Sequence, residues 1–329
     1  MTMQIEMPKI ELFRIRTFSD KLTDTFNFLR ENWRPMLKYF LYLMLPVSIV
    51  LALPFNHFFE GYFKLIASID KGNFFSSLDG WIYGLSAVVS ILGFIFAALL
   101  LESFVYAMIR VYYRRSERLR DLIYSDFRDD LYFCLKRGVI MVLVGLGIFV
   151  AIVVVAAIAM LIIFLINPKL GAVVGIVGLI IFYIAIVVLM FPLYMVAPIY
   201  MLEDETGVLA AYKKALRLGF ATWRGIFALM FVVGILASVL QTFTMTPWYI
   251  MSLVKMIFTL NHEMDKPFFH SFLYSFGQYL TCILMCLGYL LSAVISCVAI
   301  TIQYGHASEK IDGAGVSKRI DKFDEFDNF

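Results

Sequence analysis

The fold is decided by residues 139–190, VIMVLVGLGIFVAIVVVAAIAMLIIFLINPKLGAVVGIVGLIIFYIAIVVLM, where Lys169 is the one charged residue among 52. A helix that crosses a hydrocarbon core of about 30 Å needs about 20 apolar residues. The stretch is long enough for two crossings, which we place at Val139–Ile166 and Ala172–Met201. Both runs exceed the minimum length, so the helices are expected to tilt or protrude.

The composition of the whole chain agrees with this interpretation. Of its 329 residues 61% are hydrophobic and 16% are charged, with a mean hydropathy of +0.83, whereas soluble domains are about half apolar and a quarter charged. No long stretch is polar enough for a soluble domain. We therefore predict one transmembrane domain, residues 1–310, followed by a cytoplasmic tail, residues 311–329.

Four further apolar runs meet or approach the spanning length. The predicted spans are 36–53, 82–106, 139–166, 172–201, 226–243 and 272–303. The fold class is therefore all-α, a polytopic bundle of six transmembrane helices. Two other apolar segments, Phe55–Ile69 and Trp248–Leu260, are too short to span, and we expect interfacial or re-entrant helices there, on the outer side.

Basic residues determine the predicted orientation. Of the 28 Lys and Arg residues, 23 lie before the first, third and fifth spans or in the tail, and five lie in the opposite segments. Because short cytoplasmic segments are enriched in Lys and Arg, both termini are predicted to be cytoplasmic. No cleavable signal peptide is visible, since the first apolar run begins only at Met36.

The three inner segments share one pattern: an amphipathic helix of about 15 residues, a polar or aromatic–basic break, and then an apolar run. The breaks are Trp33–Arg34, Lys136–Arg137 and Trp223–Arg224. The repeat predicts three modules, each an interfacial helix plus a transmembrane hairpin. The basic faces either bind anionic headgroups or only fix the topology, and we favour the second explanation. The candidate headgroup residues are Arg34, Arg137, Lys213, Lys214 and Arg224.

A resemblance supports this layout. Residues 197–231, APIYMLEDETGVLAAYKKALRLGFATWRGIFALMF, resemble the recurring motif of bacterial six-helix proteins of the glycerophosphodiesterase-membrane-domain type. The opening, residues 18–47, and the ending, residues 303–323, resemble membrane proteins of Bacteroidetes. The resemblance implies the fold and a bacterial inner (cytoplasmic) membrane, and it implies no established activity. The phosphodiesterase domain that some members carry has no counterpart in the short tail.

Catalytic motifs are missing from the sequence. The four histidines do not have the spacing of metal ligands, and there is no GxSxG, Walker or GxGxxG motif. We predict no enzyme activity, no cofactor, no metal site and no nucleic-acid partner. The four cysteines form no CxxC pair and are interpreted as small buried apolar residues.

Glu102, in the run LLLESFVYAMIR, is the strongest intramembrane candidate. Burying a carboxylate without a partner inside the membrane costs roughly 3 kcal/mol at the least. Carboxylates within a span therefore mark candidate proton or cation sites. Alternatively, Glu102 lies at the inner interface and faces Arg110 or a neighbouring loop, which we favour. The three carboxylates Glu203, Asp204 and Glu205 either cap the N-terminus of the next helix or bind a substrate, and we favour capping.

The last span carries small and polar residues on one face, spaced by three, four or seven positions. This face either packs against another helix or lines a polar cavity, and we favour packing because nothing ionisable joins it. Its candidate polar residues are Gln278, Thr281, Ser292, Ser296 and Gln303.

The sequence therefore favours a non-enzymatic inner-membrane protein that handles lipid or assists another membrane complex. Its expected partners are membrane lipids, another membrane protein or a second copy. The alternative is a secondary transporter of a small solute, with Glu102 as the coupling carboxylate. Transporters usually bury more charged residues at the membrane midplane than this sequence offers, so we favour the first interpretation.

Overall fold

The computed structural model describes residues 9–67, 78–115, 119, 122–260, 268 and 271–316. Within these residues there is no strand, which confirms the all-α prediction. The helices are α1 (Phe18–Ala67), α2 (Leu78–Arg114), α3 (Tyr124–Ile166), α4 (Pro168–Leu193), α5 (Val196–Leu202), α6 (Val208–Ala221), α7 (Trp223–Leu260) and α8 (Phe272–Asp312). Six of them are long and apolar enough to cross a membrane, at the six predicted positions.

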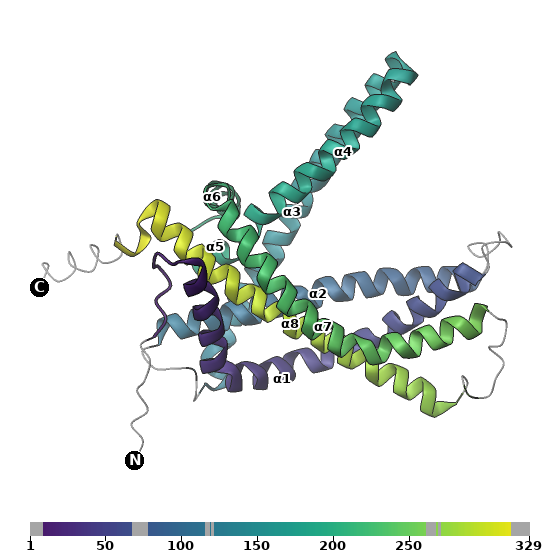
Figure 1. Ribbon diagram of the computed structural model, residues 1–329, viewed down its shortest axis with the longest axis horizontal. Helices are drawn as coiled ribbons and strands as arrows, with labels where there is room; N and C mark the ends of the chain where they lie inside the picture. The colour runs from purple at the N-terminus through teal and green to yellow at the C-terminus, as the bar shows by residue number, and fades with distance from the viewer. Residues whose placement is uncertain are drawn as a thin grey trace, which may run out of the picture.

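The long helices pair as three successive hairpins, as predicted: α1 packs on α2, α3 on α4, and α7 on α8. Helix α8 also packs along α1 and α2, so it forms the centre of a four-helix group. The α3–α4 hairpin points away from this group (Figure 1). No residue is buried in the most apolar 18-residue stretch of α3 or in that of the fourth span, which contains most of α4. In the corresponding stretch of α8, 61% of the residues are buried. The hairpin is thus the part of the bundle most open to surrounding lipid.

The amphipathic segments are not all separate helices. Helix α6 is separate, and its buried face consists of small or apolar residues. The other two amphipathic segments continue directly into the spans of α1 and α3. Helix α1 changes direction after its first part (Figure 1) and contains Pro35 where the amphipathic segment ends. Proline removes one backbone hydrogen bond and bends a helix. The break that the sequence predicts at Trp33–Arg34 is therefore a bend within the continuous helix α1.

The expectation of two outer interfacial or re-entrant helices was wrong. Described residues of the Phe55–Ile69 segment extend α1, residues 68 and 69 lie outside the described residues, and Trp248–Leu260 extends α7. Trp248 is 3% exposed and donates its indole N–H to Asn56 Oδ1 at 2.7 Å. Phe55 and Phe59 pack against the Trp248 ring. Aromatic contacts therefore keep these extensions inside the bundle.

Candidate functional site

Most of the charged residues with partners lie where α2 and α8 end and where α1 and α3 begin. Arg110 donates to Asp130 on α3 at 3.0 Å and to Asp204 at 2.7 Å. Arg114, one turn further along α2, donates to the same Asp130 oxygen at 2.7 Å. Charge-assisted hydrogen bonds of this kind are shorter and stronger than neutral ones. They fix the end of α2 to α3 and to the turn that precedes α6.

Arg137 completes the attachment of that turn. Its guanidinium donates to the backbone carbonyls of Glu203 at 2.9 Å, Asp204 at 3.1 Å and Thr206, and it lies over the Tyr200 ring. The residue is 9% exposed. Its donors are used within the protein, so Arg137 is better explained as a structural residue than as a headgroup ligand.

Glu203 has three partners of its own. Lys214 donates to its carboxylate at 2.5 Å, Thr206 at 2.7 Å, and Tyr304 of α8 donates as well. Burial alone would raise the pKa of Glu203, but these hydrogen bonds outweigh burial, and the pKa lies below its ordinary value of 4.5. The predicted capping role was wrong: the N-cap of α6 is Gly207, without a side-chain cap. Lys214 is likewise an internal partner.

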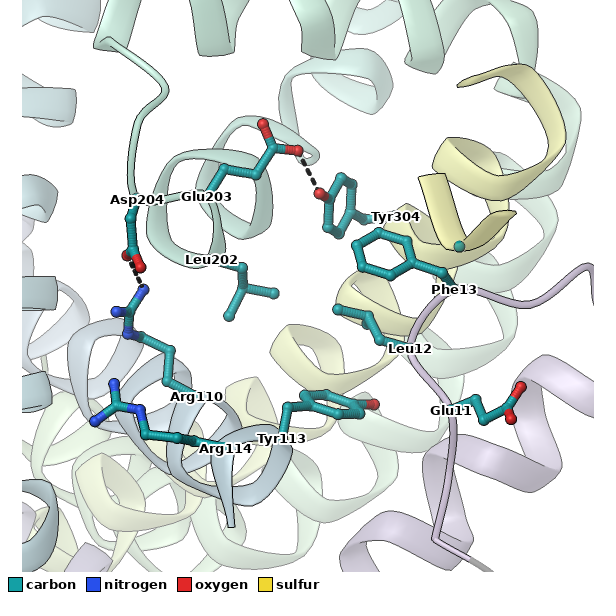
Figure 2. A pocket seen from close by; sticks show the side chains of 11 residues that line it. Glu11, Leu12, Phe13, Arg110, Tyr113, Arg114, Leu202, Glu203, Asp204 and Tyr304 are labelled. Atoms are coloured by element: carbon teal, nitrogen blue, oxygen red, sulfur yellow. Dashed lines mark hydrogen bonds and ion pairs between the residues drawn. The ribbon is translucent and has the colours of Figure 1, made fainter. Parts of the chain in front are cut away.

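A pocket of about 450 Å³ opens between these groups (Figure 2). The N-terminal segment closes one side of it, where Phe13 packs edge-on against Tyr304. The lining residues are Glu11, Leu12, Phe13, Arg110, Tyr113, Arg114, Leu202, Glu203, Asp204, Tyr304 and Gly315. Its wall carries charges of both signs, and Arg110, Glu203 and Asp204 are each paired with protein groups. The pocket therefore presents no unbalanced charge that selects an anion or a cation.

The remaining headgroup candidates are available to a ligand. Arg34, Lys213 and Arg224 are exposed, and no hydrogen bond or ion pair joins their side chains to another residue in the described part of the chain. The Arg34 guanidinium lies 5.5 Å from the centre of the Trp33 ring, and Trp33 is itself 54% exposed. An exposed Trp–Arg pair is typical of the level of lipid headgroups.

An apolar groove of about 160 Å³ runs past Trp33, between Leu29 and Phe40 of α1. Three helices line it, and none of its lining surface is polar. The lining residues are Leu29, Trp33, Met36, Leu37, Phe40, Phe104, Leu291 and Val294. The groove is apolar, and the Arg34 guanidinium lies against the Trp33 ring that forms part of its lining.

Glu102 does not face Arg110, contrary to the interpretation that we favoured. Arg110 is bound to Asp130 and Asp204, and Glu102 lies eight residues earlier, about 12 Å further along the helix axis. The carboxylate is partly buried, close to the Tyr106 hydroxyl and the Cys297 thiol. No hydrogen bond or ion pair joins it to a residue that the structure describes.

The small and polar face of α8 lies mostly against α7, in agreement with the packing interpretation. Ser292 accepts a hydrogen bond from Gln241 of α7 at 2.7 Å, and Gly288 lies directly against Thr244. Thr281 donates to its own helix and to Met251 Sδ. Gln278 is buried, whereas Ser296 is partly exposed. Gln303, at the inner end of this face, is the exception: it is buried, and its side-chain amide has no hydrogen-bond partner in the described part of the chain.

All four cysteines are buried, as expected for small apolar residues. Among the described residues, no three His, Cys, Asp or Glu side chains are grouped closely enough to hold a metal ion. Two of the histidines, His262 and His270, lie outside the described residues, as does the tail from residue 317.

Comparisons with protein-family models, with curated proteins and with solved structures found no match for the chain. The resemblance to six-helix bacterial membrane proteins stays an expectation. The chain is, on its own sequence and structure, a multi-pass α-helical membrane protein.

Proposed function

We propose that this protein is a non-enzymatic component of a bacterial inner membrane, with both termini in the cytoplasm, and that it binds anionic phospholipid in the inner leaflet. The observation that carries the proposal is the Trp33–Arg34 pair beside an apolar groove between α1, α2 and α8, with Trp33 in the lining of the groove. Part of one acyl chain lies in the groove while the phosphate contacts the Arg34 guanidinium.

The affinity of such a site comes from the headgroup. Lipid tails are as apolar as the groove, so moving a chain from the bilayer into it gains little hydrophobic free energy. A basic residue close to an anionic leaflet contributes about 1 kcal/mol, and Arg forms two parallel hydrogen bonds to a phosphate. Arg34 has no competing partner in the described part of the chain, so its donors are free for this contact. Lys213 and Arg224, which are also exposed, add to the attraction.

Native extraction in polymer nanodiscs, followed by mass spectrometry of the lipids and proteins that co-purify, tests the proposal. We expect anionic phospholipid to be enriched relative to the bulk membrane, and Arg34→Ala to remove most of the enrichment. Arg128→Ala is the matched control, because Arg128 is an exposed cation whose partner, Asp129, is also exposed. Lipid of bulk composition around the unsubstituted protein would refute the proposal. A stoichiometric protein partner would instead support a role as accessory to a membrane complex.

Proton-coupled transport of a small solute is the second candidate, and the isolated carboxylate of Glu102 favours it. Glu102 is a partly buried acid without a described partner, about 12 Å from the nearest paired arginine on its helix, and an ionisable residue inside a span is a candidate coupling site. Against it, aromatic side chains around Trp248 fill the outer part of the bundle. Glu102→Gln discriminates the two: unchanged stability and an unchanged cellular phenotype would count against transport.

A further inference from the structure

Four charged side chains at the inner end of the bundle form a chain of alternating sign. Asp204 accepts a hydrogen bond from Arg110 at 2.7 Å, and Arg110 also donates to Asp130 at 3.0 Å. Arg114 donates to the same Asp130 oxygen at 2.7 Å and ends the chain. The two inner members are mostly buried, whereas the side chains of Asp204 and Arg114 are 66% and 62% exposed. The chain therefore presents one anion and one cation to its surroundings.

Both exposed ends keep atoms that the protein does not use. Asp204 accepts from Arg110 through Oδ1, and no hydrogen bond or ion pair joins Oδ2 to a residue that the structure describes. Arg114 donates through Nη2, and its Nε and Nη1 have no partner in the described part of the chain. The hydroxyl of the neighbouring Tyr113 likewise has no hydrogen-bond partner there. One end can thus accept hydrogen bonds, and the other can donate them.

Both ends line the pocket of about 450 Å³, a volume within the usual range of roughly 300–1,000 Å³ for small-molecule sites. Figure 2 shows Arg114 and Asp204 on the left of the pocket and the apolar side chains of Leu12 and Phe13 on the right, with Leu202 between them. The pocket therefore has a charged wall and an apolar wall. An amphipathic small molecule matches this division.

The charges of the wall favour a ligand that carries both signs. An ion of a single sign would satisfy one end of the chain and lie close to a like charge at the other end, which is unfavourable. The other two carboxylates of the lining do not change this balance. Glu203 already accepts from three donors, and the Glu11 carboxylate points away from the rest of the lining (Figure 2).

We infer that this pocket binds a small zwitterion with an apolar part. Its ammonium group donates to Asp204, its oxyanion accepts from Arg114, and its apolar part packs on Leu202 and Phe13. The ligand thereby closes the alternating chain into a ring in which each charge has opposite neighbours. An apolar amino acid has this chemistry, as does the ammonium–phosphate headgroup of phosphatidylethanolamine. Ligand binding is also the second role that the sequence left open for Asp204.

Thermal unfolding of the full-length protein in dodecyl maltoside, a non-ionic detergent, tests for a soluble ligand. The probes are L-leucine, which carries both charges, isocaproate, which lacks the ammonium group, and leucinamide, which lacks the carboxylate. We expect Tm to rise with leucine. Either analogue should need an at least roughly tenfold higher concentration for the same rise, because it loses one charge-assisted hydrogen bond.

Nanodiscs test for the lipid headgroup. Discs of phosphatidylglycerol are compared with discs in which phosphatidylethanolamine replaces part of that lipid, without any amino acid. A rise in Tm that Asp204→Asn removes identifies the headgroup as a ligand. A rise with leucine alone identifies a soluble molecule, and a rise in both arms means that either source supplies the shared chemistry.

Two variants exchange the preferences of the pocket. Asp204→Asn removes the charge that binds the ammonium group, so leucine and isocaproate should then act equally. Arg114→Met removes the donor of the oxyanion, so leucine and leucinamide should then act equally. Asp129→Asn and Arg128→Met are the matched controls, because they make the same changes in an exposed ion pair outside the pocket and should keep the preference for leucine.

The titrations of the unsubstituted protein are decisive even if a variant loses stability. No rise in Tm with leucine or with phosphatidylethanolamine would overturn the inference. An equal rise with leucine and its two analogues would do the same, as would a lost preference in the controls. The pocket shares no lining residue with the Trp33–Arg34 groove, so this inference and the proposed function fail separately.

Discussion

Replacement of Arg137 by methionine is expected to be the most damaging change at the inner end of the bundle. Methionine keeps the apolar contacts with Tyr200 but leaves the carbonyls of Glu203, Asp204 and Thr206 without their donor. A hydrogen bond to a charged group contributes about 1.5 kcal/mol or more, and water entering the partly buried site recovers some of the loss. For three such bonds, partly offset by water, we expect a loss of about 3–5 kcal/mol.

The loss is measured by reversible unfolding in mixed micelles, followed by circular dichroism at increasing mole fractions of dodecyl sulfate. Arg128→Met is the control: Arg128 is 65% exposed, and its loss is expected to change stability by less than about 0.5 kcal/mol. Arg137→Lys keeps the charge but cannot span three carbonyls, so an intermediate loss is expected. A change below about 1 kcal/mol in Arg137→Met would refute the reasoning.

Three further predictions follow from other contacts. The pKa of Glu203 is lowered in the folded protein, so the carboxylate stabilises the fold above its unfolded pKa near 4.5. This contribution is lost as the pH falls through the folded pKa. Glu203→Gln should therefore flatten the acid side of a plot of Tm against pH. Gly288→Ala should destabilise the α7–α8 hairpin by about 1–3 kcal/mol, because its methyl collides with Thr244, whereas Gly147→Ala, in open space, should not lower Tm. Thiol reagents should label the four buried cysteines only after unfolding, and labelling of the native protein would contradict the packing of α3 around Cys134 or of α8 around the other three.

The six spans were predictable because their signal is local. Each apolar run is long enough to need a bilayer, and no distant residue changes that requirement. The ends of the helices were less predictable, since a polar amphipathic segment and an apolar run can belong to one continuous helix. The extension of α7 through Trp248 depends on Phe55 and Asn56, about 190 residues away, and hydropathy carries no sign of that contact.

The candidate site was predictable only in part for the same reason. Arg34 could be found because an exposed Trp–Arg pair before an apolar run is a local pattern. Arg137 also stands at a basic break before an apolar run, but its partners are carbonyls 66 to 69 residues away, which only the fold brings together. Asp204 was noticed as part of an acidic cluster, whereas Arg114 looked like one of many basic residues after the second span. Their connection through Arg110 and Asp130 comes from the packing of α2 against α3 and the turn before α6.

The central claim, that the Trp33–Arg34 groove holds an anionic phospholipid, is tested most directly by photocrosslinking in living cells. A benzophenone amino acid is placed at Leu37, inside the groove, and at Leu85, an exposed position on α2. Lipid adducts are then identified by mass spectrometry. We predict that adducts at Leu37 are enriched in anionic phospholipid, that Arg34→Ala abolishes the enrichment, and that adducts at Leu85 match the bulk membrane. Adducts of bulk composition at both positions would contradict the claim.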